Sequence, residues 1–181
     1  MGRFEGNTIV NSPLSSQDRD RLERAIELAV QAEKDGNLPI GCVISRGGVI
    51  VAEGSNRILA PVSAPHRHAE MEALAVIPVG DREVGGGLTL YTTLEPCLMC
   101  AGAISLYGIG RVVFGSKDPL GGALTAFGHL PPYFERYQSA AEWIGPALPE
   151  ACDPLFERAI ALIEARDPDL GQLLPPGSGG P

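Results

Sequence analysis

The sequence predicts an α/β fold in which antiparallel and parallel strands share one mixed sheet. Two apolar, strand-like stretches, residues 38–45 and 49–54, are separated by Gly47 and Gly48. This spacing is typical of an antiparallel hairpin. Farther along, a strand, a helix and a second strand follow one another over residues 88–115. That order predicts a parallel pair joined by a helical crossover.

The first element is expected to be a helix that starts at Ser15 and Ser16, whose hydroxyls can cap its free N–H groups. Asp18 would lie in the first turn, where a negative charge is favourable. The apolar residues that follow recur with helical spacing and form one face: Leu22, Ile26, Ala29 and Val30. Gly36 ends this helix.

After the hairpin, residues 55–67 contain two prolines and little periodicity, so they are expected to form a loop that leads to His68. A second helix is predicted from Ala69 to about Ile77, where Pro78 stops it. The glycine-rich stretch 80–87 lacks the strand-to-helix setting of a phosphate-binding loop, which favours a plain connector.

The strand–helix–strand unit consists of residues 88–93, a helix from Pro96 to about Tyr107, and residues 111–115. Pro96 would stand near the first turn of the helix, where a missing N–H costs nothing. Beyond Asp118 we expect a loop over residues 120–130, a short helix over 132–139 and a strand fragment at Trp143.

The last helix is predicted over residues 149–166. Its apolar face consists of Leu155, Ala159, Leu162 and Ile163. The resulting organisation is an N-terminal arm over residues 1–14, a single domain over 15–166, and a Pro/Gly-rich tail over 167–181 that we expect to be disordered.

Length and composition describe one ordinary globular domain. The chain has 181 residues, with 44% hydrophobic and 20% charged residues. It shows neither a membrane-length apolar run nor the apolar core of a signal peptide, and its cysteines suggest no disulfide framework, so a cytoplasmic location is expected. A formal net charge of −8 counts against a nucleic-acid partner, although a local basic patch could coexist with it.

Two short stretches carry the chemistry, His68-Ala69-Glu70 and Pro96-Cys97-Leu98-Met99-Cys100. One imidazole and two thiols make three ligands for Zn²⁺, which prefers four, so one position stays open for water. The remaining cysteines, Cys42 and Cys152, stand alone and offer no obvious fourth ligand.

Each stretch alone has a plainer interpretation. His68 and Glu70 could belong to a solvated helix start, and a lone C-x-x-C could be a redox pair or half of a zinc knuckle. Their combination favours a catalytic zinc site. Two thiolates cancel most of the metal's charge and acidify its water less, so a nearby base is needed, and Glu70 is the candidate.

Two longer motifs carry a family resemblance, residues 36–41 (GNLPIG) and residues 89–104 (TLYTTLEPCLMCAGAI). Together with the H-x-E…P-C-x-x-C pattern, they resemble the cytidine deaminase superfamily. The branch resembled holds bacterial tRNA adenosine deaminases, fungal-type cytosine deaminase and guanine deaminase. The resemblance implies a three-layer α/β/α sandwich with a five-stranded mixed sheet, a homodimer, and one zinc per chain held by His68, Cys97 and Cys100.

The same resemblance suggests residues that would contact the substrate. Asn56 matches an asparagine that hydrogen-bonds the base or ribose, although a loop asparagine can also cap its own turn. Ile40 and Leu94 would line the base pocket or simply belong to the core.

Beyond Asp118 the resemblance is faint, and the residues alone suggest a further contact. The segment 118–137 contains Phe127, His129, Tyr133 and Phe134, which could form an aromatic lid over the zinc or else pack the last helix.

The family's tRNA enzymes read Asp-Pro-Thr-Ala before the histidine, whereas this chain has Ala64-Pro65-His66-Arg67. His66 and Arg67 could contact substrate or an anionic group, or be ordinary surface residues. The last helix is near neutral instead of basic. The sequence therefore predicts a zinc-dependent hydrolytic deaminase of a free nucleobase or nucleoside, with a tRNA adenosine-to-inosine deaminase as the alternative and a non-catalytic zinc scaffold as a remote one.

Overall fold

The computed structural model describes residues 13–77, 87–138, 140–167 and 169. Its centre is one five-stranded sheet with the strand order β2-β1-β3-β4-β5. The strands are β1 (Gly41–Arg46), β2 (Val49–Ser55), β3 (Leu88–Leu94), β4 (Arg111–Ser116) and β5 (Glu142–Ile144). β1 pairs antiparallel with β2 and β3, whereas β3–β4 and β4–β5 are parallel. The predicted mixed sheet is confirmed.

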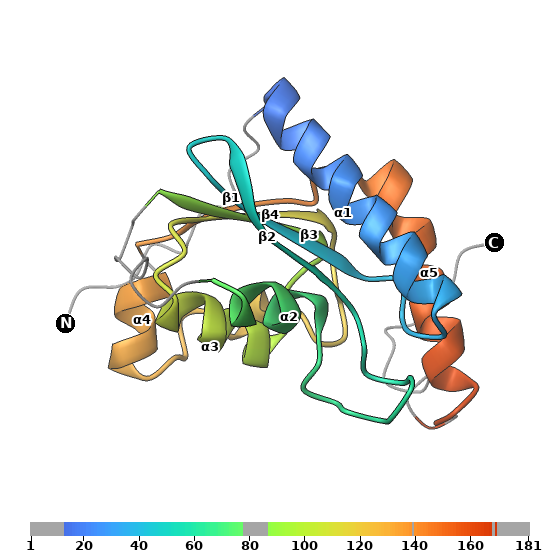
Figure 1. The fold of residues 1–181 in the computed structure, drawn as a ribbon. Coiled ribbons are helices and arrows are strands. Elements are labelled where there is room, and N and C mark those ends of the chain that lie inside the picture. Colours follow the sequence, from blue (N-terminus) through green and yellow to red (C-terminus); the bar gives the residue numbers. More distant parts are fainter. Residues whose placement is uncertain (1–12, 78–86, 139, 168, 170–181) are drawn as a thin grey trace.

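Helices cover both faces of the sheet, as Figure 1 shows. The helices are α1 (Ser16–Lys34), α2 (Ala69–Ala75), α3 (Leu98–Leu106), α4 (Pro132–Gln138) and α5 (Pro149–Glu164). α1 and α5 lie on one side, and α2 and α3 lie on the other with α4 beside them. The three-layer α/β/α sandwich is therefore confirmed. No helix in the described part of the chain combines the length and the apolarity needed to cross a bilayer.

Alternation along the strands divides the core into two layers. In β1, Cys42 and Ile44 pack toward α2 and α3, whereas Val43 between them packs toward α1. Val112 and Val113 of β4 divide in the same way. Successive side chains of a strand point to opposite faces, so a fully buried strand must be apolar on both.

Asp18 anchors α1 to the sheet. Ser15 caps the helix, as the sequence predicts, and Asp18 completes a capping box with it. Asp18 also accepts hydrogen bonds from Arg111 at 2.6 Å and from Tyr91 at 3.0 Å. Burial raises the pKa of Asp18, but the hydrogen bonds from Arg111, Ser15 and Tyr91 outweigh it and lower that pKa to about 2. The cluster fixes the start of α1 over β3 and β4.

Residues 38–40 correct one sequence prediction, because β1 begins only at Gly41. The N–H of Ile40 donates to the carbonyl of Leu38 at 2.7 Å, which forms a tight turn. Oδ1 of Asn37 accepts the N–H groups of Leu59 and Ala60 at 2.9 Å each, so the turn is tied to the loop after β2. Pairing with a side chain and a loop replaces the strand pairing that the apolar pattern suggested.

Other boundaries move slightly. α3 starts at Leu98 with Cys97 as its N-cap, and the expected loop over residues 120–130 contains the short 3₁₀ helix η2 (Ala123–Ala126). The predicted connector 80–87, arm 1–14 and tail 167–181 lie mostly outside the described residues.

Gly54 lets α2 pack unusually close to β2. A Cβ atom at this position would lie 2.1 Å from the carbonyl oxygen of Ala69 and 2.5 Å from the backbone nitrogen of Ala73. Both atoms belong to the helix backbone and cannot rotate away. Because His68 and Glu70 stand at the start of α2, this close contact determines how deeply both side chains reach under the sheet.

We predict that Gly54→Ala lowers the free energy of unfolding by at least about 2 kcal/mol, because the added methyl group must push α2 away from β2. Gly102→Ala is the matched control. Its Cβ would meet only Phe134, at 3.8 Å, and alanine favours helix by up to about 1 kcal/mol. Urea unfolding of the zinc-loaded proteins measures both. Equal stability of the two variants would contradict the close-packing account.

Candidate active site

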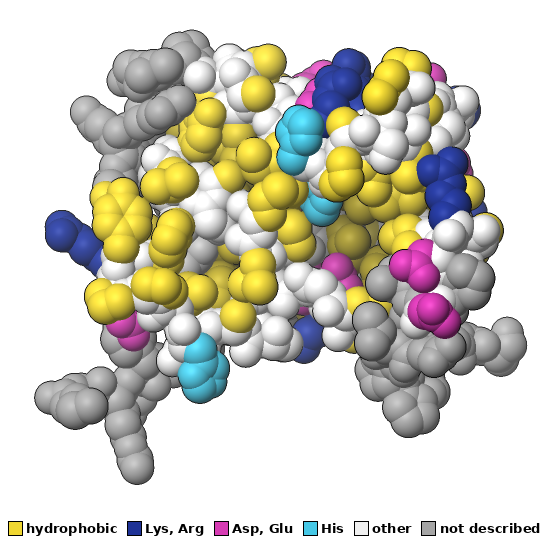
Figure 2. All heavy atoms as spheres, turned by 90° about the horizontal axis from the view of Figure 1, so that it is seen from below, with side chains coloured by type: hydrophobic (Ala, Val, Ile, Leu, Met, Phe, Trp, Pro, Cys, Tyr) yellow, Lys and Arg dark blue, Asp and Glu magenta, His cyan; other side chains and the backbone are white. Residues whose placement is uncertain are grey.

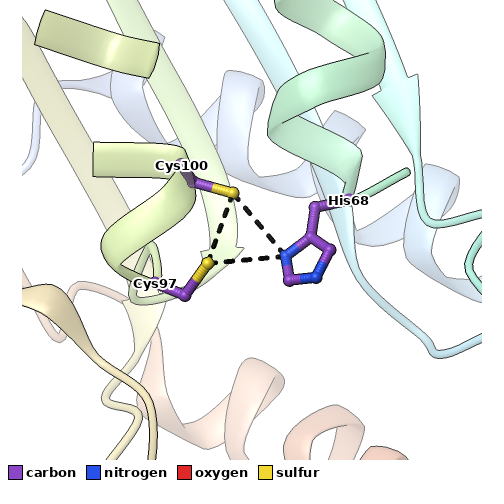
Figure 3. Close-up of side chains that lie close together, drawn as sticks. All are labelled: His68, Cys97 and Cys100. Atoms are coloured by element: carbon purple, nitrogen blue, oxygen red, sulfur yellow. Dashed lines mark hydrogen bonds between the residues drawn. The ribbon is translucent and has the colours of Figure 1, made fainter. Parts of the chain in front are cut away.

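Three potential ligand atoms from two helix N-termini meet beneath the sheet (Figure 3). His68 is the N-cap of α2, Cys97 is the N-cap of α3, and Cys100 lies one turn further along α3. The two sulfurs are 3.6 Å apart, and each lies 3.6 Å from Nδ1 of His68. Cys97 and Cys100 follow His68 by 29 and 32 residues in the chain, yet the three side chains converge on one point.

The spacing of the three atoms fits zinc. Tetrahedral coordination with ordinary Zn–S and Zn–N bond lengths separates two sulfurs by about 3.8 Å and a sulfur from a nitrogen by about 3.6 Å. The three atoms lie within 4.8 Å of one another, and they form the metal-binding cluster among the described residues. A fourth ligand position is left for a small molecule, as in catalytic zinc sites.

The surroundings of the two thiols shift their pKa values in a way that favours binding of a cation. The hydrogen bond with Cys100 lowers the pKa of Cys97 to about 4, with a further contribution from His68. The same hydrogen bond, together with burial, raises the pKa of Cys100. One thiolate is therefore already favoured without metal. Zinc binding must release the proton that Cys100 retains, because the metal binds thiolates.

Glu70 lies beside the ligand cluster with 3% of its surface exposed. Thr92 of β3 donates to its Oε1 at 3.0 Å, and the Cys100 thiol lies 3.6 Å from its Oε2. Burial raises the pKa of Glu70, against the lowering effect of its backbone, His68 and Thr92. A buried carboxyl with a raised pKa beside a metal site is suited to taking up and returning a proton.

A cavity of about 340 Å³ opens onto His68, Glu70 and Cys97. Its volume is within the ordinary range of small-molecule sites. Figure 2 shows a hollow with hydrophobic walls and a histidine at its margin on the underside of the molecule. Most of the lining is apolar and comes from residues 38–40, the loop after β2, the end of β3, and α5.

Glu95 also lines the cavity and holds one of its walls. Its carboxylate accepts the N–H of Leu124 at 3.1 Å and, more weakly, the N–H of Asp118 at 3.3 Å. A Cβ atom on Gly122 would lie 2.4 Å from this carboxylate, so glycine is needed there. Backbone pairing between Cys97 and Gly122 further joins the wall to a zinc ligand. No local pattern in the sequence indicates this role of Glu95.

Three predicted substrate contacts lie at or beside the cavity. Ile40 and Leu94 line it directly. Asn56 is 1% exposed, and its Nδ2 has no hydrogen-bond partner. Its backbone N–H donates to Ile40, and its Oδ1 accepts the N–H of Ile58, which also lines the cavity.

Other predicted contacts lie elsewhere. Phe127 packs edge-to-face against Trp143 at 5.1 Å and belongs to a smaller apolar pocket between α3 and α4, so it does not line the cavity at the zinc ligands. Phe134 lines that second pocket too. Both aromatic residues thus line a pocket at α3 and α4, whereas the packing alternative placed them against the last helix. Arg67 forms a two-pronged ion pair with Glu72, and His66 is exposed.

Comparison with known proteins agrees with this geometry. Residues 15–116, more than half of the chain, match the family described as the cytidine and deoxycytidylate deaminase zinc-binding region. The chain belongs to this family. It is therefore a hydrolytic zinc-dependent deaminase, and His68, Cys97 and Cys100 form a cluster that could hold its zinc.

Proteins similar to this deaminase are named for different substrates. A tRNA-specific adenosine deaminase of Bacillus subtilis is 38% identical over 141 residues, which cover 76% of this chain and 84% of that protein. A probable cytosine deaminase of Schizosaccharomyces pombe is 37% identical over 127 residues, which cover 68% of this chain and 76% of that protein. Membership of the family therefore does not determine the substrate class.

Solved structures of deaminases also match this chain. One from a study of tRNA:A34 deaminases matches with a TM-score of 0.61 and 30% identity, covering 72% of this chain and 100% of that chain. A guanine deaminase of Nitrosomonas europaea matches with a TM-score of 0.61 at 20% identity, covering 82% of this chain and 87% of that chain. This second likeness shows the shared fold.

We predict that the purified deaminase carries about one zinc per chain and that Cys100→Ala loses it together with much of its stability, because two protein ligands cannot hold the metal as three do. Elemental analysis and thermal unfolding measure the two effects. Cys152→Ala is the control, since Cys152 is buried on α5 against Gly115, outside the ligand cluster. Full zinc occupancy in Cys100→Ala would refute the assignment of this ligand.

Proposed function

We propose that this protein is a cytoplasmic deaminase of a free nucleobase or nucleoside, with residues 15–166 as its catalytic domain. The lining of the cavity carries the proposal. Among the described residues, the cavity is lined by no lysine or arginine, and three carboxylates face it, those of Glu70, Glu95 and Asp118. A phosphate group would therefore meet negative charge without a compensating cation. A neutral aminated ring has no such cost, since stacking and a few hydrogen bonds at its edge suffice to bind it.

Different residues around the cavity would bind the metal and transfer protons. Zinc held by His68, Cys97 and Cys100 would supply a Lewis acid that makes water nucleophilic at neutral pH. Glu70 would accept a proton from the attacking water and deliver it to the ring nitrogen, and would then transfer the proton of the new hydroxyl group to the leaving amine. A bond from water oxygen to the ring carbon forms, the carbon–nitrogen bond breaks, and ammonia leaves. The raised pKa of Glu70 favours the protonated form that delivery requires.

Asn56 is proposed to orient the ring. Its buried Nδ2 offers two N–H donors without an acceptor in the structure, and an unpaired donor in such a place is costly unless a ligand satisfies it. Ile40 and Leu94 would contact the faces of the ring. Phe127 is not included, because it packs on the other side of α3.

A tRNA adenosine deaminase is the second candidate, favoured by the 38% identity to the Bacillus subtilis enzyme. The charge of α5 argues against it. This helix carries four carboxylates and one guanidinium, that of Arg158, which Glu33 holds in a two-pronged ion pair at 2.7 and 3.1 Å. Arg67 is similarly engaged by Glu72. Binding to a phosphate backbone relies on available lysine and arginine side chains.

The test measures ammonia release from free bases and nucleosides beside an adenosine-containing anticodon stem-loop. We predict turnover of at least one small substrate and weak, nearly salt-independent binding of the stem-loop. Glu70→Gln keeps the shape of the side chain and removes the base, so turnover should fall about 10²–10⁴-fold while zinc stays bound. Efficient deamination of the stem-loop with no turnover of any small substrate would identify the tRNA enzyme instead.

We also propose that two copies of the chain associate through the face formed by α2, α3 and α4. Large apolar side chains on these helices are exposed: Val76 (62%), Leu98 (57%), Met99 (39%), Leu106 (54%) and Tyr133 (55%). Figure 2 shows hydrophobic side chains spread over this face. An apolar surface of this kind on a monomer marks an interaction site. Because Leu98 and Met99 stand between two zinc ligands, a partner copy would border the active site.

Leu98→Asp is predicted to convert the dimer to a monomer, measured as molar mass by light scattering across a concentration series. An aspartate in the first turn of a helix is locally favourable, so α3 should persist. Val62→Asp is the control, since Val62 is even more exposed (74%) but lies on the loop after β2. A monomeric wild-type protein, or a Leu98→Asp dimer of unchanged affinity, would contradict this interface.

A further inference from the structure

One wall of the active-site cavity comes entirely from the last helix. Phe156, Ala159, Ile160 and Ile163 of α5 all line the cavity. Their spacing of three, four and seven residues places them on one face of the helix. Leu38 and Ile58 add apolar surface to the same cavity from other parts of the chain. None of these six side chains can donate or accept a hydrogen bond.

The polar groups of the cavity come from other elements and are largely committed. His68 and Cys97 belong to the zinc site, and the oxygens of Glu95 already accept two backbone N–H groups. Asp118 Oδ1 accepts two more, from Leu120 and Gly121, at 2.9 Å each. The cavity thus has a polar side, which contains the proposed reacting groups, and an apolar wall formed by α5.

The wall is held firmly in place. Cys152 and Leu155 at the start of α5 are buried, and Asp153 accepts a hydrogen bond from Ser116 of β4 at 2.5 Å. The ion pair between Arg158 and Glu33 attaches the middle of α5 to α1. A helix fastened to both the sheet and α1 presents a fixed surface that a ligand must match.

We propose that this α5 wall is a subsite for an apolar substituent, so that the substrate is an aminated heterocyclic base bearing an alkyl group instead of a sugar. The inference rests on the proposed deaminase activity toward small substrates and deepens it. A sugar turned toward α5 would lose the hydrogen bonds that water gives its hydroxyl groups and would find no replacement. An alkyl group in the same place would displace water from apolar surface, and one such carbon changes selectivity about 10–200-fold.

The experiment uses two series of three substrates, and the members of each series differ only in the group on one ring nitrogen. One series is cytosine, 1-methylcytosine and cytidine, and the other is adenine, 9-methyladenine and adenosine. In at least one series we expect kcat/KM for the methylated base to equal or exceed that of the free base and to exceed that of the nucleoside at least about tenfold.

Variants of α5 test whether the wall causes this preference. Ile160→Ser should lower the ratio of kcat/KM for the methylated base to that for the nucleoside at least about fivefold, because a hydroxyl group now lines the wall. Ile160→Val, which stays apolar, should leave the ratio within about twofold. Phe156→Tyr adds a hydroxyl group without removing volume and serves as an independent second variant. Zinc content and thermal unfolding verify that each variant is folded.

Two results would overturn the subsite while leaving the proposed function intact. The first is a nucleoside turned over as well as, or better than, the methylated base in both series. The second is a ratio that neither Ile160→Ser nor Phe156→Tyr changes. If wild-type protein releases ammonia from none of these six compounds, nor from guanine or guanosine, the proposed function itself fails and the subsite fails with it.

Discussion

The structure depends on keeping the first residues of α2 and α3 together under one edge of the sheet. Zinc tolerates little variation in ligand distance, so Nδ1 of His68 and the sulfurs of Cys97 and Cys100 must stay near their 3.6 Å separations. Neither helix is long enough to be stable alone. Their positions come from the sheet above them, through the close contact of α2 with Gly54 and the direct continuation of β3 into α3.

Burial of Glu70 follows from the same arrangement. The side chain enters the space between the ligand cluster and β3, where Thr92 is its hydrogen-bond donor. An ionised carboxylate in such a place is costly unless a cation lies beside it. Zinc held by the three ligands would provide that charge together with the imidazole of His68. The proposed ligands and the proposed base would therefore depend on one another electrostatically.

Local patterns allowed much of this to be predicted from the sequence. The hairpin, the strand–helix–strand unit, the capping of α1 and the zinc ligands all depend on residues close in sequence or on a specific motif. Features that depend on long-range packing could not be predicted. The turn at residues 38–40 requires the Asn37 side chain to reach the loop after β2. The role of Glu95 requires contact with backbone N–H groups 23 and 29 residues further along the chain. The position of Phe127 likewise depends on Trp143, a contact that no local pattern indicates.

The α5 wall has a consequence for how the cavity can be altered. The family match spans residues 15–116 and contains all three zinc ligands and Glu70, whereas the α5 side chains that line the cavity lie at positions 156–163. Mutations in this helix can reshape the cavity without touching the reacting groups. The shape of the cavity and the groups proposed to react in it can therefore be altered independently of each other.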